Sequence, residues 1–181
     1  MASNRHLGRI IALQSMYEYE FRVKAGDASA TLDSIIAKNI IPYEKALGDT
    51  EFVYSLTHGV AEKMKVLDQE LAPLAPEWPI ESIAAIDRNV LRLGLYELEL
   101  GEVPPKVAIN EAVELAKAFG SDNSSKFVNG VLGTAFRNLG LSDEAAPTQE
   151  VAANKEESSH EQASTKETAP KGPKDTGSTA D

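Results

Sequence analysis

One segment near the middle of the chain, residues 83–100, is apolar in almost every direction around a helical wheel. Its charged strip is narrow and consists of Arg88, Arg92 and Glu99. A helix that is apolar nearly all round is surrounded by other elements, whereas a surface helix carries a wide polar face. The chain is therefore expected to pack several further helices around this segment.

Helical spacing recurs on both sides of that segment. Apolar residues return every three or four positions, and no run of strict alternation suggests a strand. Proline and glycine residues mark the ends of the helical patterns. We expect helices over residues 3–22, 31–41, 49–72, 80–100, 106–119 and 123–140, the fourth of them kinked or split near Ala85. This order predicts an all-α fold, a compact orthogonal bundle of about seven helices.

Residues 142–181 have a composition that does not support a packed core. They contain one Val and no Leu, Ile, Phe, Met, Trp or Tyr, together with 9 acidic and 4 basic residues. Such a segment buries too little apolar surface to offset the entropy of ordering it. We predict a helical domain at 1–141 and a disordered acidic tail, rich in Ala, Glu, Ser, Thr and Pro, at 142–181.

A search for catalytic and metal-binding motifs finds none. The chain has no Cys and only 3 His, and no two His residues have the spacing of metal ligands. It contains no phosphate-binding glycine loop, no dinucleotide fingerprint and no Gly-x-Ser-x-Gly turn. We therefore expect a binding protein that is not an enzyme and uses no metal or cofactor.

Charge and hydropathy narrow the class of partner. The formal net charge of −10 argues against indiscriminate DNA binding but leaves room for a local basic patch. The chain has no run of 18 apolar residues, and its first residues lack the apolar core of a secretory signal. We expect a cytoplasmic protein with no membrane partner.

The first expected helix begins with the bases Arg5, His6 and Arg9 and carries no acid before residue 16. Its predicted core stripe consists of Leu7, Ile10, Ile11, Tyr17 and Phe21, with Gln14 inside it. Arg5 and Arg9 point the opposite way, and their side of the helix continues through Ala12, Met16 and Tyr19. Two interpretations are open for that side. It is packed by another helix beyond a solvated start, or it is a contact face whose arginines reach phosphates.

The last expected helix has two different faces. Its predicted core stripe consists of Val128, Val131, Leu132, Ala135 and Leu139, with Phe127 and Phe136 at the margins. The opposite face is small and basic, and it consists of Lys126, Gly130, Gly133 and Arg137. This face is either solvated or approached by a chain that carries an anion. Phe127, near the capping residue Asn123, is either a core side chain or a stacking partner for one unpaired base.

Several acidic side chains have simple structural interpretations. Asp87 is either a helix-end carboxylate near an unsatisfied amide or a carboxylate at the rim of an apolar partner surface. The pairs Glu18 with Glu20 and Glu97 with Glu99 are two residues apart, which puts their members on different sides of a helix. We expect these glutamates to lie on solvated faces.

Four ordered motifs in the second half of the helical region resemble the NusB family. They are VLRLGLYEL at 90–98, VPPKVAINEAVELAK at 103–117, FG at 119–120 and SKFVNGVL at 125–132. The opening RIIALQSMY at 9–17 is similar to the family's Arg-x-x-Ala-x-Gln-x-x-Tyr start. The resemblance covers residues 3–140, with residues 25–80 matching in helical layout only.

This resemblance implies an all-helical transcription antitermination factor. Members of the family pair with NusE, a ribosomal small-subunit protein, and the pair binds the single-stranded boxA element of ribosomal RNA transcripts. The complex joins elongating RNA polymerase with other Nus factors and suppresses premature termination. The family implies no catalysed reaction and no cofactor.

The resemblance also implies roles for individual residues. The family's basic amino terminus falls on Arg5, His6 and Arg9. The other positions implied to contact RNA are Lys106, Asn123, Lys126 and Phe127. The positions implied to contact the partner protein are Tyr17 and Asp87. Asn110 matches the family motif, and we expect it to be a buried hydrogen-bonding side chain.

Other interpretations stay open. A helical protein–protein adaptor without RNA specificity is one, and a detached RNA-binding domain of a ribosomal-RNA cytosine methyltransferase is another. A homodimer is a further possibility, with the side bearing Met16 and Tyr19 as a candidate surface. The acidic tail either masks the basic face against nonspecific RNA or is a solubilising extension.

Overall fold

The computed structural model describes residues 2–141, and this part of the chain is built from helices without a β-strand. The α-helices of the described region are Ala2–Lys24 (α1), Leu32–Ile40 (α2), Glu44–Leu47 (α3), Glu51–Leu71 (α4), Ala85–Leu100 (α5), Pro105–Phe119 (α6) and Ser124–Asn138 (α7). Short 3-10 helices cover Ile41–Tyr43 (η1), Ala72–Leu74 (η2) and Ile80–Ser82 (η3). The predicted all-α bundle is confirmed. The predicted tail at 142–181 lies outside the described residues.

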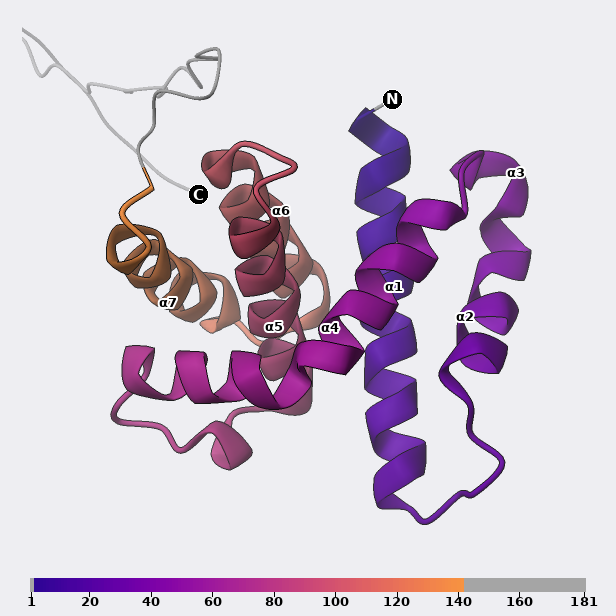
Figure 1. Cartoon of the computed structure of the whole chain (residues 1–181), viewed down its shortest axis with the longest axis horizontal. Helices are drawn as coiled ribbons and strands as arrows, with labels where there is room; N and C mark the ends of the chain where they lie inside the picture. Colours follow the sequence, from indigo (N-terminus) through magenta and orange to yellow (C-terminus); the bar gives the residue numbers. More distant parts are fainter. Residues whose placement is uncertain (1, 142–181) are drawn as a thin grey trace, which may run out of the picture. The chain divides into compact units, whose positions relative to one another are not determined.

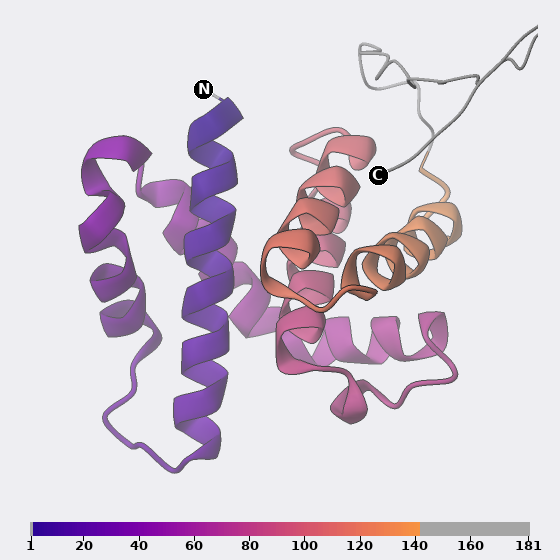
Figure 2. The same ribbon diagram turned by 180° about the vertical axis from the view of Figure 1, so that it is seen from behind.

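Helix α1 stands between two groups of helices (Figures 1 and 2). Helices α2 and α3 lie along one side of it, and α5, α6 and α7 form a group on the other side. Helix α4 crosses α1 and contacts both α2 and α5. Helix α1 therefore joins a small core with α2 to a large core around α5.

Burial along α1 differs from the predicted stripe. Ile11 is buried as expected, but Tyr17 and Phe21 are 40 % and 65 % exposed. Ala12 and Met16 are completely buried, which confirms the packed interpretation for the middle of their side and excludes Met16 from a self-association surface. The predicted stripe was wrong because the side of α1 that packs against α2, α4 and α5 runs through Ile11, Ala12 and Met16 and leaves Tyr17 and Phe21 outside it.

Helix α5 lies at the centre of the large core, as its apolar wheel predicts. It contacts α1, α4, α6 and α7, and only its two ends and Tyr96 lie outside the buried set. Gly94 is required by this packing. A Cβ atom there would lie 2.5 Å from Leu132 Cδ1 of α7 and 3.1 Å from Ala112 Cβ of α6.

The predicted break near Ala85 is confirmed and places the first turn of α5. Helix η3 ends at Ser82, Ile83 and Ala84 are extended, and α5 begins at Ala85. The backbone changes direction there because Ala84 has a ψ of 136°. This change of direction puts Asp87 next to the start of α7, where its carboxylate meets Ser124.

Charged side chains are buried where α5 meets α1 and α4. Arg88 donates to Glu20 at 2.5 Å, and Arg92 donates to Glu20 at 3.1 Å and to Asp68 at 2.7 Å. Burial alone would raise the pKa of Glu20, but hydrogen bonds from neighbouring Lys, Asn and Arg side chains and the Arg92 charge lower it to about 2. The expectation that Glu20 lies on a solvated face is therefore wrong.

The described residues contain no helix that is long and apolar enough to cross a membrane. Within the same residues, no three His, Cys, Asp or Glu side chains lie close enough together to hold a metal ion.

Replacing Glu20 tests the buried charge network. Because the pKa of Glu20 falls from 4.5 to about 2 on folding, its stabilising effect is complete above about pH 4.5 and is lost as the pH falls toward 2. Glu20→Gln should lower the free energy of unfolding by about 2 kcal/mol at pH 7. Urea unfolding at pH 3 should give a smaller difference, and Glu62→Gln, an exposed change on α4, should have little effect at either pH. A difference for Glu20→Gln that does not depend on pH would contradict this account.

Glu99 provides the opposite pH dependence. Burial, a hydrogen bond with Glu70 and the charge of Glu70 raise the pKa of Glu99 from 4.5 to about 7, although Lys63 opposes the shift. Folding therefore binds a proton here, and stability should fall as the pH rises from about 4.5 to 7. Glu99→Gln should add about 1 kcal/mol at pH 8 and nothing at pH 4 in the same urea measurement. An equal gain at both pH values would show that the carboxylate pair is not the cause.

Candidate nucleic-acid interface

Arg9 is part of a buried ion pair between α1 and α5. Its Nε atom lies 2.8 Å from Glu97 Oε2 and its Nη2 atom lies 2.7 Å from Glu97 Oε1, so the guanidinium donates two hydrogen bonds to the carboxylate. Both side chains are almost fully buried. The expectation that Arg9 points away from the core, and the expectation of a solvated Glu97, are wrong. Arg9 joins helices, and any effect it has on RNA acts through the position of α1.

His6 and Arg5 lie at the amino-terminal end of the same helix. His6 Nδ1 is 2.7 Å from Glu111 Oε2 on α6, and the His6 side chain is 40 % exposed. Arg5 is exposed, and its guanidinium lies 5.2 Å from the centre of the Phe52 ring of α4. Phe52 comes this close because residue 8 is glycine, where a Cβ atom would lie 2.7 Å from the ring. The aromatic face therefore supports an arginine that remains accessible.

The start of α6 adds one further exposed base to this end of the molecule. Lys106 is exposed in the first turn of α6, the helix that also carries Glu111. Asn110 is exposed on the same helix, so the expectation of a buried, hydrogen-bonding Asn110 is wrong. The structure thus brings Arg5, His6 and Lys106 to helices that contact each other through His6 and Glu111.

The start of α7 holds the second group of expected RNA contacts. Asn123 is the N-cap residue and is exposed, but its side chain forms no capping hydrogen bond. Lys126 is exposed in the first turn, and Phe127 is half-buried at the edge of the large core. The side chain that organises this turn is Ser124, whose Oγ accepts a hydrogen bond from the Ser121 backbone N–H at 2.8 Å. Asn123 is therefore available for contacts outside the helix.

The outer face of α7 agrees with its predicted pattern. Lys126, Gly130 and Arg137 are exposed, and Gly133 is half-buried. The predicted core residues Val128, Val131, Leu132 and Ala135 are buried, whereas Leu139 is 45 % exposed because it lies beyond the last residue of the helix.

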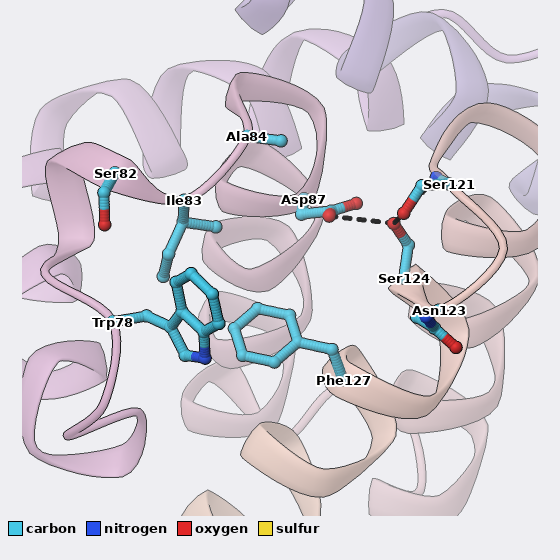
Figure 3. Close-up of a pocket in the computed structure, with 9 residues that line it drawn as sticks. All are labelled: Trp78, Ser82, Ile83, Ala84, Asp87, Ser121, Asn123, Ser124 and Phe127. Atoms are coloured by element: carbon cyan, nitrogen blue, oxygen red, sulfur yellow. Dashed lines mark hydrogen bonds between the residues drawn. The ribbon is translucent and has the colours of Figure 1, made fainter.

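Asp87 connects the start of α7 with a separate groove. Its Oδ2 atom accepts a hydrogen bond from Ser124 Oγ at 2.8 Å, as Figure 3 shows. Its Oδ1 atom is buried and has no hydrogen-bond partner among the described residues. Asp87 also lines a groove of about 270 Å³ together with Tyr17 of α1 and Phe119 of α6. The expected helix-end contact with an amide is replaced by a side-chain hydroxyl, and Asp87 lies at the border of a partly apolar surface.

The expected RNA residues thus form two groups that α6 separates. One group lies around the amino terminus and the start of α6, and the other lies at the start of α7. Helix α6 has 15 residues, so the two groups are about 20 Å apart along its axis. The expected partner residues Tyr17 and Asp87 share one groove, next to the second group.

Sequence reasoning missed two aromatic side chains. Phe52 lies within the expected helix 49–72, but nothing in the sequence indicates that its ring supports Arg5. Trp78 was not considered, and its side chain is 57 % exposed beside Phe127 in Figure 3. The signal available for Trp78 was its place between Pro76 and Pro79, in a connection where a large apolar side chain has no helical stripe to join.

A family model and a relative of known name both match most of the chain, and they agree on the family. A family model described as "NusB family" matches residues 6–137. The chain is 42 % identical over 137 residues to a protein of Chloroflexus aggregans named "Transcription antitermination protein NusB", covering 74 % of this chain and 87 % of the relative.

Solved structures agree at the level of the fold. NusB of T. maritima aligns with a TM-score of 0.65 and 30 % identity, covering 74 % of this chain and 90 % of that chain. A chain from a crystal structure of the antitermination factors NusB and NusE in complex with double-stranded RNA aligns with a TM-score of 0.64 and 22 % identity. That alignment covers 76 % of this chain and 99 % of the other chain.

Replacing the two amino-terminal arginines separately tests their different roles. Arg9→Ala leaves the Glu97 carboxylate buried without its partner, and should lower the free energy of unfolding by about 3 kcal/mol. Arg5→Ala removes only an exposed cation–π contact, and should cost less than about 1 kcal/mol. Urea unfolding at pH 7 measures both values.

A double variant tests whether the unpaired charge of Glu97 causes the loss of stability in Arg9→Ala. Arg9→Met with Glu97→Leu replaces the ion pair by apolar side chains and should recover most of the stability lost in Arg9→Ala. If the double variant stays as unstable as Arg9→Ala, the ion pair is not the cause of the loss.

Proposed function

The chain belongs to the NusB family, and from this premise we propose that it acts as a transcription antitermination factor. In this role it binds the single-stranded boxA element of ribosomal RNA transcripts together with NusE. It joins elongating RNA polymerase and other Nus factors in the cytoplasm and regulates termination there. It is not an enzyme, in keeping with relatives that are named transcription antitermination proteins.

One contact carries this proposal: the hydrogen bond from Ser124 Oγ to Asp87 Oδ2. Ser124 belongs to the turn that displays Asn123, Lys126 and Phe127, the expected contacts for RNA. Asp87 lines the groove of Tyr17, the expected surface for the partner protein. The expected surface for RNA and the expected surface for the partner protein are therefore linked by one carboxylate, which supports joint binding of two partners.

The proposed RNA contacts divide by chemistry. Arg5, Lys106 and Lys126 supply positive charge for phosphates, and Phe127 supplies an aromatic face for a base. Asn123 offers both a donor and an acceptor, and half-exposed His6 lies beside Arg5 on α1. Arg9 contributes by fixing α1 against α5 through Glu97. A single strand that reaches both groups follows α6 for about 20 Å.

The proposed partner surface is the groove that Tyr17 and Asp87 line. Tyr17 and Phe21 are exposed one helical turn apart on α1, and Phe119 is 38 % exposed on α6. Exposed aromatic side chains of this kind are enriched where proteins bind each other. The free Oδ1 atom of Asp87 is an acceptor for an N–H group of the partner once the groove opens to it.

Binding of a labelled boxA-like RNA, with and without NusE, tests this function. The expected result is tighter retention of the boxA-like RNA than of a scrambled RNA of the same composition, with a further gain when NusE is added. A double-stranded RNA of the same length serves as a third competitor. Equal retention of all three RNAs in every condition would favour the protein–protein adaptor.

Single substitutions test the proposed RNA contacts and the proposed partner surface separately. Arg5→Ala and Lys126→Ala should each reduce the slope of log affinity against log salt by about 0.7, the value for one lost phosphate contact on a single strand. Lys38→Ala, on α2 across α1 from α7, is the matched control and should leave that slope unchanged. Tyr17→Ala should remove the gain from NusE while RNA binding alone stays at its original level. Unchanged salt slopes for both basic variants would contradict the proposed RNA contacts.

A further inference from the structure

The strongest unassigned feature of the described residues is Trp78. Its side chain is 57 % exposed, although an indole is one of the largest apolar groups that a protein can bury. The segment that carries it is held in place, because Pro76 and Pro79 flank it and the Trp78 backbone N–H donates to the Ala75 carbonyl at 3.0 Å. Trp78 is therefore a fixed apolar surface open to solvent.

Trp78 has an aromatic neighbour on α7. Figure 3 shows the indole beside the ring of Phe127, and both side chains line the same pocket of about 410 Å³. Both also line a second pocket of about 340 Å³, which Lys126 and Gly130 share. Phe127 in turn packs against the large core. The two aromatic side chains thus form a layer with an open pocket on either side.

The exposed face of α7 beside these pockets has the charge that a polyanion requires. The exposed face of α7 runs from Lys126 through Gly130 and Gly133 to Arg137 and carries no acid. A Cβ atom at Gly130 would meet no other atom within 4 Å, so space above the helix backbone is open beside the aromatic layer. Each pocket also has one acidic lining residue: Glu77 in the second pocket, and in the first Asp87, whose Oδ2 atom accepts a hydrogen bond from Ser124.

We propose that Trp78, supported by Phe127, is a stacking site for an unpaired nucleobase of the bound RNA. This inference rests on the proposed function, and it extends the RNA surface from α7 onto the connection between η2 and η3. The base lies against the indole face, and its phosphates follow the acid-free face of α7 from Lys126 toward Arg137. Stacking of this kind accepts any base, because every base has a π-face.

The chain offers a direct probe, because Trp78 is its single tryptophan. A base stacked on the indole should quench the tryptophan fluorescence of the full-length protein, and the quenching should saturate together with the anisotropy of a labelled RNA strand. An abasic strand of the same length and charge separates stacking from phosphate binding. It should bind more weakly and leave the fluorescence unchanged.

Substitutions make the same test independent of fluorescence. Trp78→Ala should weaken RNA binding about tenfold, and Trp78→Phe should restore most of the affinity. Neither change should alter the salt slope, because stacking involves no phosphate contact, whereas Lys126→Ala should reduce it. Tyr43→Ala is the matched control, since Tyr43 is also an exposed aromatic residue, lies on η1 across α1 from α7, and should not affect binding.

The outcomes separate this inference from the proposed function. RNA binding with full affinity in Trp78→Ala and without quenching would overturn the stacking site while leaving the antitermination role intact. Quenching by NusE in the absence of RNA would also overturn it, because the indole would then be a protein contact. Absence of specific RNA binding in the unaltered protein, with and without NusE, would overturn the proposed function itself.

Discussion

The structure depends on the way in which α5 buries charge. This helix is covered on several sides, yet it carries Arg88, Arg92 and Glu97 inside the fold, and each one pairs with an opposite charge from another helix. Removing such charges from water is costly, so the arrangement is stable only when all partners are in place. Apolar packing would tolerate several rotations of α1 against α5. Two ion pairs permit only one rotation of α1, because they fix this helix at two points on different turns. They are the pairs Arg9–Glu97 and Glu20–Arg88.

That single rotation decides what α1 displays. With Arg9 and Glu20 turned inward, Tyr17 and Phe21 point outward beside the groove of Asp87, and Arg5 lies over the Phe52 ring at the other end. The exposed aromatic pair and the exposed arginine are thus consequences of the buried ion pairs. One helix with two buried sides can therefore present both the exposed aromatic pair and the exposed arginine that the proposed function uses.

The elements of the fold could be predicted from the sequence, because spacing and helix-ending residues are local signals. The break before Ala85, the central position of α5 and the two faces of α7 follow from patterns within each segment. The roles of Arg5 and Arg9 could not be distinguished, since they differ only in a partner that lies 88 residues away in Glu97. For the same reason a solvated face was expected for Glu20 and Glu97. Trp78 was missed because it belongs to no helical pattern. Its place beside Phe127 in one pocket follows only from the three-dimensional structure.

The position of Asp87 has a thermodynamic consequence for the proposed function. One oxygen of its carboxylate holds Ser124 and so helps to order the turn that precedes α7, while the other oxygen has no partner in the described structure. A protein that donates a hydrogen bond to the second oxygen fixes the carboxylate, and with it the turn that presents Asn123, Lys126 and Phe127. In the proposed function, RNA binds this turn, so protein and RNA act on the same hydrogen-bonded unit. Such a coupling is reciprocal, since the factor by which the protein changes the affinity for RNA equals the factor by which RNA changes the affinity for the protein. The hydrogen bond between α5 and α7 therefore gives the two proposed surfaces a direct structural link, through which binding at one surface affects the other once the groove opens to Oδ1.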